Sequence, residues 1–301
     1  MKSQIAQGLE HEARFYRRVG EHAVVCDLCP RVCQIKPGMT GVCRVRRNVD
    51  GRLIAESYGR PVAMQVDPIE KKPLCRYRPG SQTYSIGTYG CNLMCQFCQN
   101  ESLSRNGYPM WNDAPCVLPE RIVEQAVRHG CESVSFTYNE PTVFFEYMVD
   151  IAKLAREAGL GTVLVSNGFI TAEARAELYP LIDAANIDVK GFSETFYKEL
   201  CGASLAPVLE SCRYFKQEAG GHLEITNLLI PNRNDSPTMI RGLLDWAGPT
   251  LGYDTPIHFT AYHPMGGFAE PATPPATVHT AVDLAKTLGF TCVRAGNVWP
   301  S

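Results

Sequence analysis

The stretch Thr-Tyr-Ser-Ile-Gly-Thr-Tyr-Gly-Cys-Asn-Leu-Met-Cys-Gln-Phe-Cys occupies residues 83–98 and carries the most specific pattern in the chain. A short apolar segment ends at the turn Tyr89-Gly90, and a loop with the spacing Cys-x3-Cys-x2-Cys follows at once. Three thiolates so close together can ligate one iron–sulfur cluster and leave one of its irons without a protein ligand. Because an open coordination position distinguishes catalytic from structural metal sites, the loop formed by Cys91, Cys95 and Cys98 predicts a reactive centre.

Downstream of this loop, short apolar runs alternate with stretches that repeat apolar residues at three- and four-residue steps. The predicted strands are residues 83–87, 133–138, 161–166, 185–189, 223–230 and 257–262. The predicted helices are residues 119–129, 142–158, 172–178, 207–218, 238–247 and 277–288. Such alternation is typical of right-handed βαβ units around a parallel sheet. Six units are fewer than the eight of a closed barrel, so the pattern predicts an α/β fold with a partial (β/α)6 TIM-like barrel over residues 81–301.

Polar residues follow every predicted strand of the barrel. In βα architectures the active site lies at the carboxyl ends of the strands, because the loops there converge on one rim. The first strand leads into the cysteine loop, and the later strands end at Asn139 and Glu140, Ser166 and Asn167, Asp188 and Lys190, Asn232, and His263. The sequence therefore predicts a single polar rim that contains the cysteine loop.

A second group of cysteines lies near the N-terminus. Its members are closely spaced, with glycines at the bends, and they are Cys26, Cys29, Cys33 and Cys43. Four thiolates can surround one ion tetrahedrally and leave no position for a substrate, which is typical of a structural site. Zinc and an additional iron–sulfur cluster both accept four thiolates, so the spacing leaves the identity of the metal open.

Residues 1–80 are predicted to form a small module ahead of the barrel. Charged residues within the first twenty positions favour an amphipathic surface helix, and Asp50-Gly51 between apolar residues indicates a tight hairpin. Prolines at positions 68, 73 and 79 indicate a linker from this metal-bound β module into the barrel.

Composition indicates a soluble globular protein of a reducing compartment. The 301 residues are 45% hydrophobic, which is enough for one large core with a small appendage. Thirteen cysteines without an apolar secretory segment favour metal ligation over disulfides, so a cytoplasmic location with no membrane span is expected. A net charge of -2 gives no general attraction for a polyanion, and a nucleic-acid partner is not expected.

The cysteine loop, with Phe97 just before its last cysteine, and the βα repeats after it resemble the radical S-adenosylmethionine (SAM) superfamily. The resemblance implies that Cys91, Cys95 and Cys98 hold a [4Fe-4S] cluster whose open iron binds the amino and carboxylate groups of SAM. It also implies that an electron from a donor such as flavodoxin or ferredoxin cleaves the sulfonium. The resulting 5′-deoxyadenosyl radical would abstract a hydrogen atom from an unidentified substrate, so a radical SAM enzyme is expected.

Two rim segments resemble those that bind the methionyl part of SAM. The segment Tyr138-Asn139-Glu140-Pro141 stands where a Gly-Gly-Glu segment is common, so Glu140 resembles the acceptor for the methionyl ammonium. Asp188 and Lys190 resemble the Asp-x-Lys segment of glycyl-radical activating enzymes, in which the lysine contacts the methionyl carboxylate and the aspartate helps to hold a monovalent cation. The structural alternatives are a helix-capping Glu140 and a simple Asp188–Lys190 ion pair.

The remaining rim residues complete the expected cosubstrate pocket. Ser166-Asn167-Gly168 resembles a Thr-Asn-Gly segment of the activating enzymes, although Val165 stands where those enzymes carry an acidic cation ligand. Phe97 and the segment Leu228-Leu229-Ile230-Pro231-Asn232 resemble the residues that lie along the adenine, and both can equally belong to the core. His263 is expected to hydrogen-bond the cosubstrate, to protonate the substrate, or to be structural.

Motifs along nearly the whole chain resemble the radical SAM protein of the AmmeMemoRadiSam system, a family similar to pyruvate formate-lyase activating enzyme. They include the N-terminal cysteine spacing, the segment 67–74 and the closing Gly296-Asn297. The family name implies partners that resemble the Memo and AMMECR protein families. Residues 75–77, 265–268 and 293–295 depart from the family pattern, so the substrate end is expected to differ.

Three other functions are compatible with the same residues. A glycyl-radical activating enzyme would act on a backbone glycine of a partner glycyl-radical enzyme. An aminocarboxypropyl transferase would cleave a different sulfonium bond of SAM and release methylthioadenosine. A non-enzymatic, metal-stabilised binding protein would need Cys75 or Cys116 to complete the ligands of the three-cysteine loop.

Overall fold

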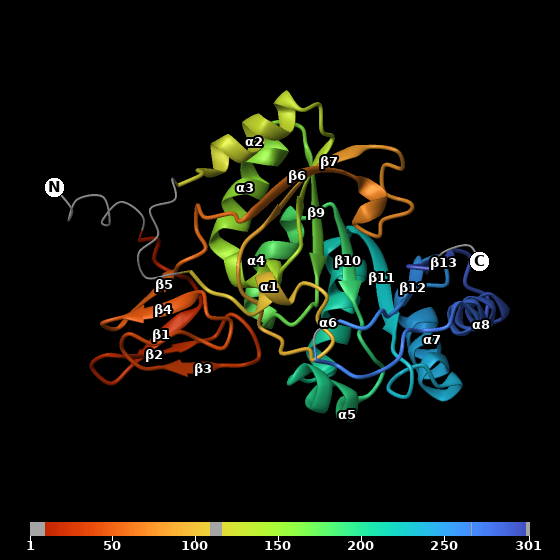
Figure 1. Ribbon diagram of the computed structural model, residues 1–301. Helices are drawn as coiled ribbons and strands as arrows, with labels where there is room; N and C mark the ends of the chain where they lie inside the picture. The colour runs from red at the N-terminus through yellow and green to blue at the C-terminus, as the bar shows by residue number, and fades with distance from the viewer. Residues whose placement is uncertain (1–9, 109–115, 266, 299–301) are drawn as a thin grey trace.

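A large sheet forms the centre of the molecule (Figure 1). The computed structural model describes residues 10–108, 116–265 and 267–298. The sheet has eight strands in the order β13-β12-β11-β10-β9-β8-β7-β6, and neighbouring strands are parallel except for the antiparallel pair β6 and β7. These strands are β6 (Ala63–Pro68), β7 (Gln82–Gly87), β8 (Ser133–Phe136), β9 (Gly161–Ser166), β10 (Ala184–Asp188), β11 (His222–Leu229), β12 (Ile257–Ala261) and β13 (Val293–Gly296).

All six predicted barrel strands are confirmed, and two further strands extend the sheet at its edges. β6 lies before the predicted boundary at residue 80, in the part of the chain assigned to the N-terminal module, and it ends at Pro68, the first proline of the predicted linker. It pairs from Ala63 opposite Gly87 to Pro68 opposite Gln82. Consecutive residues of β6 are exposed, so it lacks the alternation of buried and exposed residues expected of a strand. β13 has four residues with an exposed pair in the middle, so it is also inconspicuous. The parallel part of the sheet therefore has seven strands rather than six.

Helices flank the sheet and bury their apolar faces against it (Figure 1). They are α1 (Glu101–Ser104), α2 (Pro119–Arg128), α3 (Phe145–Glu157), α4 (Ala172–Leu178), α5 (Glu194–Phe196), α6 (Ala206–Tyr214), α7 (Pro237–Leu251) and α8 (Pro275–Thr287). Short 3₁₀ or π turns are η1 (Ile69–Lys71), η2 (Pro141–Phe144), η3 (Tyr179–Leu181), η4 (Tyr197–Cys201) and η5 (Phe215–Ala219). In α3, for example, Met148, Ile151 and Ala155 recur at helical spacing and are fully buried. Within the described ranges, no helix combines the length and apolar character needed to cross a lipid bilayer.

The N-terminal residues form a small β module beside the barrel (Figure 1). A three-stranded antiparallel sheet consists of β1 (Tyr16–Val19), β2 (Ala23–Cys26) and β3 (Cys33–Ile35), and a hairpin consists of β4 (Arg46–Val49) and β5 (Arg52–Ala55). The predicted hairpin turn is confirmed, because Asp50 and Gly51 both have positive φ angles, of 50° and 83°. A turn of this kind matches the right-handed twist of the two strands that it connects.

The predicted N-terminal helix is wrong for residues 10–20. This segment is extended: β1 pairs with β2, and Ala13 N donates a hydrogen bond to the Leu53 carbonyl at 2.7 Å. The charged residues fall at steps that fit a helix face, but the backbone groups find partners in the neighbouring strands and Ala13 is buried among them. Residues 1–9 of the predicted helix lie outside the described residues.

Candidate active site

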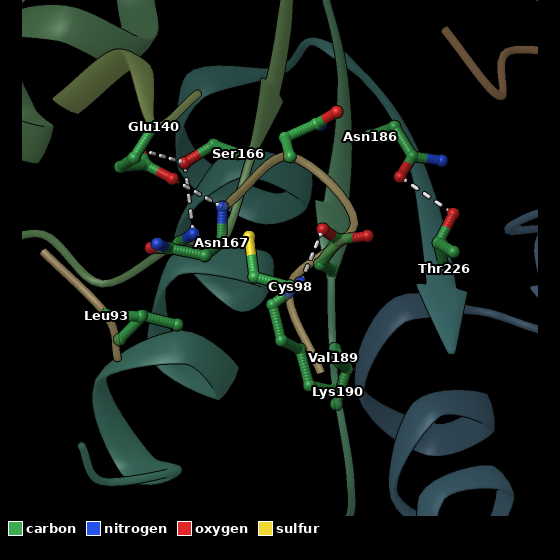
Figure 2. A network of polar contacts seen from close by, with 12 residues as sticks. Leu93, Cys98, Glu140, Ser166, Asn167, Asn186, Val189, Lys190 and Thr226 are labelled. Atoms are coloured by element: carbon green, nitrogen blue, oxygen red, sulfur yellow. Dashed lines mark hydrogen bonds and ion pairs between the residues drawn. The ribbon is translucent and has the colours of Figure 1, made fainter. Parts of the chain in front are cut away.

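A cavity of about 550 Å³ lies at the carboxyl ends of the parallel strands. Most of the residues predicted for the polar rim line it, namely Cys91, Cys95, Phe97, Cys98, Tyr138, Asn139, Glu140, Ser166, Asn167, Asp188 and Lys190. Figure 2 shows part of this wall, with Glu140, Ser166 and Asn167 joined by hydrogen bonds near Cys98 and Lys190. The cavity has the volume of a small-molecule or cofactor site.

The cysteine loop is held by contacts of its own backbone. Met94 N donates to the carbonyl of Cys201 in η4 at 2.8 Å, so the loop pairs with the chain that follows β10. From the other side, the guanidinium of Arg105, just after α1, donates to the Cys95 carbonyl at 2.9 Å. These backbone groups of the loop therefore have hydrogen-bond partners other than the thiols. The three thiols of the loop line the cavity together.

Three asparagines fix the chain around the first cysteine of the loop. Asn139 donates from its amide to the Gly90 carbonyl at 2.9 Å and so shapes the turn before the loop. Asn167 donates to Asn92 Oδ1 at 2.9 Å, and its amide nitrogen lies 3.7 Å from Cys91 Sγ. Asn139 and Asn167 were predicted site residues, whereas Asn92, which is 1% exposed, was not. Its position inside the loop was the only sequence signal for it.

Glu140 is buried in the cavity wall, where its carboxylate accepts four hydrogen bonds. Figure 2 shows the two that come from Ser166 and Asn167. Oε1 accepts from Thr142 N, Thr142 Oγ1 and Ser166 Oγ at 2.9, 2.7 and 2.7 Å, and Oε2 accepts from Asn167 N at 2.8 Å. Glu140 thus caps η2, as the structural alternative expected. Burial raises the pKa of this carboxyl group, although the hydrogen bonds oppose the rise. Oε2 retains a lone pair for another donor, because a carboxylate oxygen can accept two hydrogen bonds.

Lys190 and Asp188 form an ion pair on the same wall. Lys190 Nζ lies 2.8 Å from Asp188 Oδ2, and the side chains are 18% and 34% exposed. Burial acts to lower the pKa of Lys190, but the negative charges of Asp188 and Cys95 outweigh it and raise this pKa well above its usual value. The amine is therefore a cation with two N–H groups beyond the one used by Asp188.

The donor chemistry of the cavity fits an iron–sulfur cluster. Three thiols from one loop line one space, and thiolates are the usual ligands of such clusters. Burial raises the pKa of Cys91 well above its ordinary value. In contrast, a hydrogen bond with the thiol of Cys201 lowers the pKa of Cys95. Cys201 is fully buried and was interpreted only as an isolated cysteine, because it lies far along the sequence from the loop.

Neither cysteine suggested as a fourth ligand for the loop lies beside it. Cys75 Sγ lies 3.5 Å from Cys292 Sγ, next to β13. Cys116 packs against Gly59 in the segment between the N-terminal module and β6. Neither Cys75 nor Cys116 therefore completes the three-cysteine loop.

Three predicted site residues do not line the cavity, and their roles stay predictions. The chain leaves β11 after Leu229, so Ile230 turns into the core and is fully buried, while Leu228 lines the cavity. Asn232 is exposed at a position with a φ of 65°. His263 is exposed, with Nε2 3.0 Å from the Asn297 carbonyl.

Lysines 71 and 72 line the cavity, although they were not among the predicted site residues. Asp67 accepts hydrogen bonds from Lys71 Nζ and Lys72 Nζ, both at 2.7 Å, and from the Tyr138 hydroxyl at 2.6 Å. Lys72 is 1% exposed and Asp67 is 3% exposed. The four-residue spacing of Asp67 and Lys71 was a sequence signal for their ion pair. The sequence did not show that these lysines line the cavity, because that depends on the pairing of β6 with the sheet.

The four N-terminal cysteines also line one space. A cavity of about 20 Å³ is lined by Cys26, Cys29, Cys33 and Cys43, together with Arg46 and Asn92. Burial raises the pKa of Cys29 to about 12 and that of Cys43 to about 11. A bound cation would displace these thiol protons. The donor set fits a thiolate-bound metal, and Asn92 connects this cavity to the cysteine loop of the barrel.

The sequence matches the family model described as the Radical SAM superfamily over residues 85–243, more than half of the chain. An uncharacterized protein of Methanocaldococcus jannaschii is 41% identical over 290 residues, which cover 95% of this chain and 85% of that protein. The pyruvate formate-lyase-activating enzyme of Listeria monocytogenes is 25% identical over 186 residues, which cover 59% of this chain and 73% of that enzyme. A solved radical SAM methyltransferase from Sphaerobacter thermophilus has a TM-score of 0.57 at 12% identity, and the match covers 96% of this chain and 78% of that chain. This last similarity shows a shared fold.

Proposed function

Because the chain belongs to the radical SAM superfamily, we propose that it cleaves SAM reductively and uses the 5′-deoxyadenosyl radical to abstract a hydrogen atom from a separate substrate. Membership of the superfamily implies a [4Fe-4S] cluster and SAM. The cluster supplies the electron for the cleavage when it is bound. One observation carries the proposal: three thiols, a buried carboxylate and a lysine line the same cavity.

Cys91, Cys95 and Cys98 are the proposed cluster ligands. Their loop is held by Met94 N and by Arg105, so the thiols are free to bind iron without loss of these backbone contacts. Asn139 and Asn167 would act as positioning residues, because they hold the turn before the loop and its first cysteine. Three ligands leave one iron of a four-iron cluster open to the cosubstrate.

Glu140 and Lys190 are the proposed contacts to the two ends of the methionyl group. Glu140 Oε2 receives one hydrogen bond, from Asn167 N, and keeps a lone pair for the ammonium. Lys190 has N–H donors for the carboxylate, and Asp188 holds it in place. The opposite charges of Glu140 and Lys190 match those of an amino acid.

The aromatic and apolar wall would bind the adenosine part. Phe97 and Leu228 line the cavity, and Phe97 packs on Phe196 and Phe268 at ring-centroid distances of 5.8 and 6.0 Å. An apolar wall of this kind can stack against a nucleobase and excludes water from a radical. Ser166 stays engaged with Glu140 and so keeps the carboxylate oriented.

The test is production of 5′-deoxyadenosine by anaerobically reconstituted protein with dithionite and SAM. Wild type is expected to release it, and Cys95→Ala is expected to release none. Cys131→Ala is a matched control, because Cys131 is buried outside the cavity wall. Equal yields from wild type and Cys95→Ala would overturn the proposal, as would methylthioadenosine as the main product, which indicates aminocarboxypropyl transfer.

Activation of a glycyl-radical enzyme is a second candidate, supported by the similarity to the Listeria activating enzyme. In that case the hydrogen atom would come from a backbone glycine of a partner protein. A glycyl doublet in the electron paramagnetic resonance spectrum of such a partner, present after turnover with wild type and absent with Cys95→Ala, would support it. No doublet with any glycyl-radical partner tested would favour another substrate.

Partner proteins follow from the resemblance of the full chain. A flavodoxin or ferredoxin is the proposed electron donor, and Memo-like and AMMECR-like proteins are the proposed further partners. The test is whether flavodoxin with its reductase replaces dithionite, and whether either partner changes the rate of 5′-deoxyadenosine release. A protein that neither changes this rate nor binds the chain would no longer be a proposed partner.

The four N-terminal cysteines are proposed to hold a structural zinc ion. A cavity of about 20 Å³ has room for about one ion, which favours a single zinc ion over a second cluster. Wild type and Cys29→Ser are therefore expected to contain equal iron, with less zinc in the variant. A loss of iron from Cys29→Ser, with zinc unchanged, would instead indicate an iron–sulfur cluster.

A further inference from the structure

A second group of potential metal ligands lies at the opposite end of the barrel from the cysteine loop. Glu224 in β11 precedes Thr226 by two residues, and His258 in β12 precedes Thr260 by two residues. Both threonines line the active-site cavity. Because residues two apart on a strand share a face, Glu224 and His258 lie on the inner face of the sheet, one step below that cavity.

The loop of residues 72–80 brings Cys75 to these two side chains. Asn186 Nδ2 donates to the Pro73 carbonyl at 2.8 Å. The Glu224 carboxylate accepts from Cys75 N at 2.9 and 3.0 Å, and from Arg76 N at 2.9 Å. Hydrogen bonds from the loop backbone to side chains of the sheet therefore hold Cys75 beside Glu224.

We propose that Cys75, Glu224 and His258 bind a divalent transition-metal ion, with zinc as the first candidate. One ligand atom from each residue lies within 4.8 Å of the others. Cys292, just before β13, offers a fourth donor, because its Sγ lies 3.5 Å from Cys75 Sγ. Zinc–sulfur and zinc–nitrogen bonds of about 2.3 and 2.0 Å separate tetrahedral donors by roughly 3.3–3.8 Å. The two sulfur atoms already have such a separation.

The other distance in the cluster requires a small adjustment. His258 Nε2 and Glu224 Oε2 are 2.5 Å apart, which is a hydrogen-bond distance. Binding of an ion between them would widen this gap by about 1 Å. His222 Nε2 lies 2.9 Å from Glu224 Oε1 and would act as a positioning residue for the ligating carboxylate, as outer-shell groups do in metal sites.

The charge balance around Glu224 supports a cation at this position. Glu224 is fully buried, and among the described residues its hydrogen-bond partners are two backbone amides and two imidazoles. The guanidinium of Arg294 in β13 lies nearby, where a hydrogen bond to Cys75 and the charges of Cys75, Cys292 and Glu224 raise its pKa, so a bound ion would share these negative groups with Arg294. Buried carboxylates are normally paired with a cation or bound to a metal. A divalent ion would neutralise this carboxylate together with the Cys75 thiolate.

The ligand types favour zinc or a similar ion. A thiolate, an imidazole and a carboxylate are the donors that zinc binds in proteins, whereas calcium and magnesium prefer sets of oxygen atoms. Bound here, the ion would join the loop of residues 72–80 to β11 and β12. Lys72 and Pro73 of this loop line the active-site cavity, so the ion would fix part of the cavity floor.

The test compares zinc and iron per chain, by mass spectrometry of metals, in anaerobically purified and zinc-incubated protein. Cys75→Ser and His258→Asn are expected to contain about one zinc less than wild type, with iron unchanged. Cys131→Ser controls for loss of a buried thiol elsewhere, and Cys29→Ser separates this site from the N-terminal cysteines. Zinc contents of Cys75→Ser and His258→Asn that equal the wild-type value would overturn the proposal.

If the variants do not fold, two measurements on the wild-type protein can still test the proposed site. Zinc-edge X-ray absorption is expected to show nitrogen or oxygen ligands together with sulfur, and a shell of sulfur alone would overturn the site. Alkylation of the denatured, unreduced protein followed by peptide mass spectrometry is expected to find Cys75 and Cys292 as thiols. A disulfide between them would overturn the proposal, because neither sulfur would then be a thiolate ligand.

Discussion

Arg46 and Glu146 form a two-pronged ion pair that joins the N-terminal module to the barrel. Arg46 Nη1 lies 3.0 Å from Glu146 Oε2, Arg46 Nη2 lies 3.0 Å from Glu146 Oε1, and the side chains are 2% and 1% exposed. Arg46 belongs to β4 and also lines the cavity of the four N-terminal cysteines, while Glu146 belongs to α3. The two parts of the chain therefore share a buried charge pair.

Glu146→Gln is expected to destabilise the whole chain by about 3–5 kcal/mol, because it leaves the Arg46 guanidinium buried without a charged partner. The free energy of unfolding by urea measures this effect. Glu124→Gln is the matched control: Glu124 pairs with Arg121 on the surface, where the side chains are 59% and 52% exposed, and such pairs contribute about 1 kcal/mol or less. Equal effects of the two substitutions would contradict the importance of the buried pair.

Asp67 is expected to make stability depend on pH at the acid end. Burial acts to raise the pKa of Asp67, but hydrogen bonds from Lys71, Lys72 and Tyr138 outweigh it and hold this pKa well below its ordinary value. A carboxyl whose pKa is lower in the folded state stabilises the fold above its unfolded pKa of about 4, and this contribution is lost as the pH falls through the folded value.

Asp67→Asn is therefore expected to be less stable than wild type at pH 7 by about 3 kcal/mol, since it leaves Lys72 buried without a carboxylate. The difference should narrow as the pH falls below about 4, because unfolded wild type then binds a proton at Asp67 that the folded protein does not bind. Urea unfolding at several pH values measures it. Asp245→Asn, which removes an exposed pair with Arg241, should give a difference near zero throughout. A constant gap between wild type and Asp67→Asn down to pH 3 would argue against the assignment.

The sequence predicted the parts of the site that local patterns determine. The spacing of Cys91, Cys95 and Cys98 lies within one loop, and Glu140 and Lys190 follow apolar runs whose period identifies strands. Since parallel strands place their carboxyl ends on one rim, these residues could be assigned to one cavity before the structure was known.

Residues that depend on contacts between distant segments could not be predicted in the same way. The segment at residues 16–19 becomes a strand through its pairing with β2, and local charge spacing does not reveal this. Ile230 follows the end of β11, where the direction of the chain is set by the turn at Asn232. Cys75 and Glu224 are 149 positions apart and meet only because the loop after η1 contacts β11.

Glu140→Gln is expected to weaken SAM binding by about 10- to 100-fold, the usual loss for a hydrogen bond to a charged group. The amide keeps one oxygen for Thr142 and Ser166 but removes the negative charge proposed for the ammonium. Equilibrium binding of SAM to the reconstituted protein measures the effect, with iron content as the check on the cluster. Glu101→Gln, at an exposed position at the start of α1 that does not line the cavity, should bind SAM as wild type does. Unchanged affinity in Glu140→Gln would restrict Glu140 to its capping role.

Cys201→Ala is expected to leave the iron content at the wild-type level and to shift the midpoint potential of the cluster. Cys201 is fully buried, and its hydrogen bond to Cys95 raises its own pKa, so it remains a thiol that can donate to the Cys95 sulfur. A donor at a ligating sulfur stabilises the additional negative charge of the reduced state. Its removal should therefore lower the potential.

A redox titration followed by electron paramagnetic resonance measures this shift. Cys212→Ala is the matched control, because Cys212 is equally buried in α6 and does not line the cavity. A potential equal to that of the wild type would show that the contact between Cys201 and Cys95 does not persist in the loaded protein. A loss of iron from Cys201→Ala, comparable to that from Cys95→Ala, would make Cys201 a ligand and would close the open corner on which SAM cleavage depends.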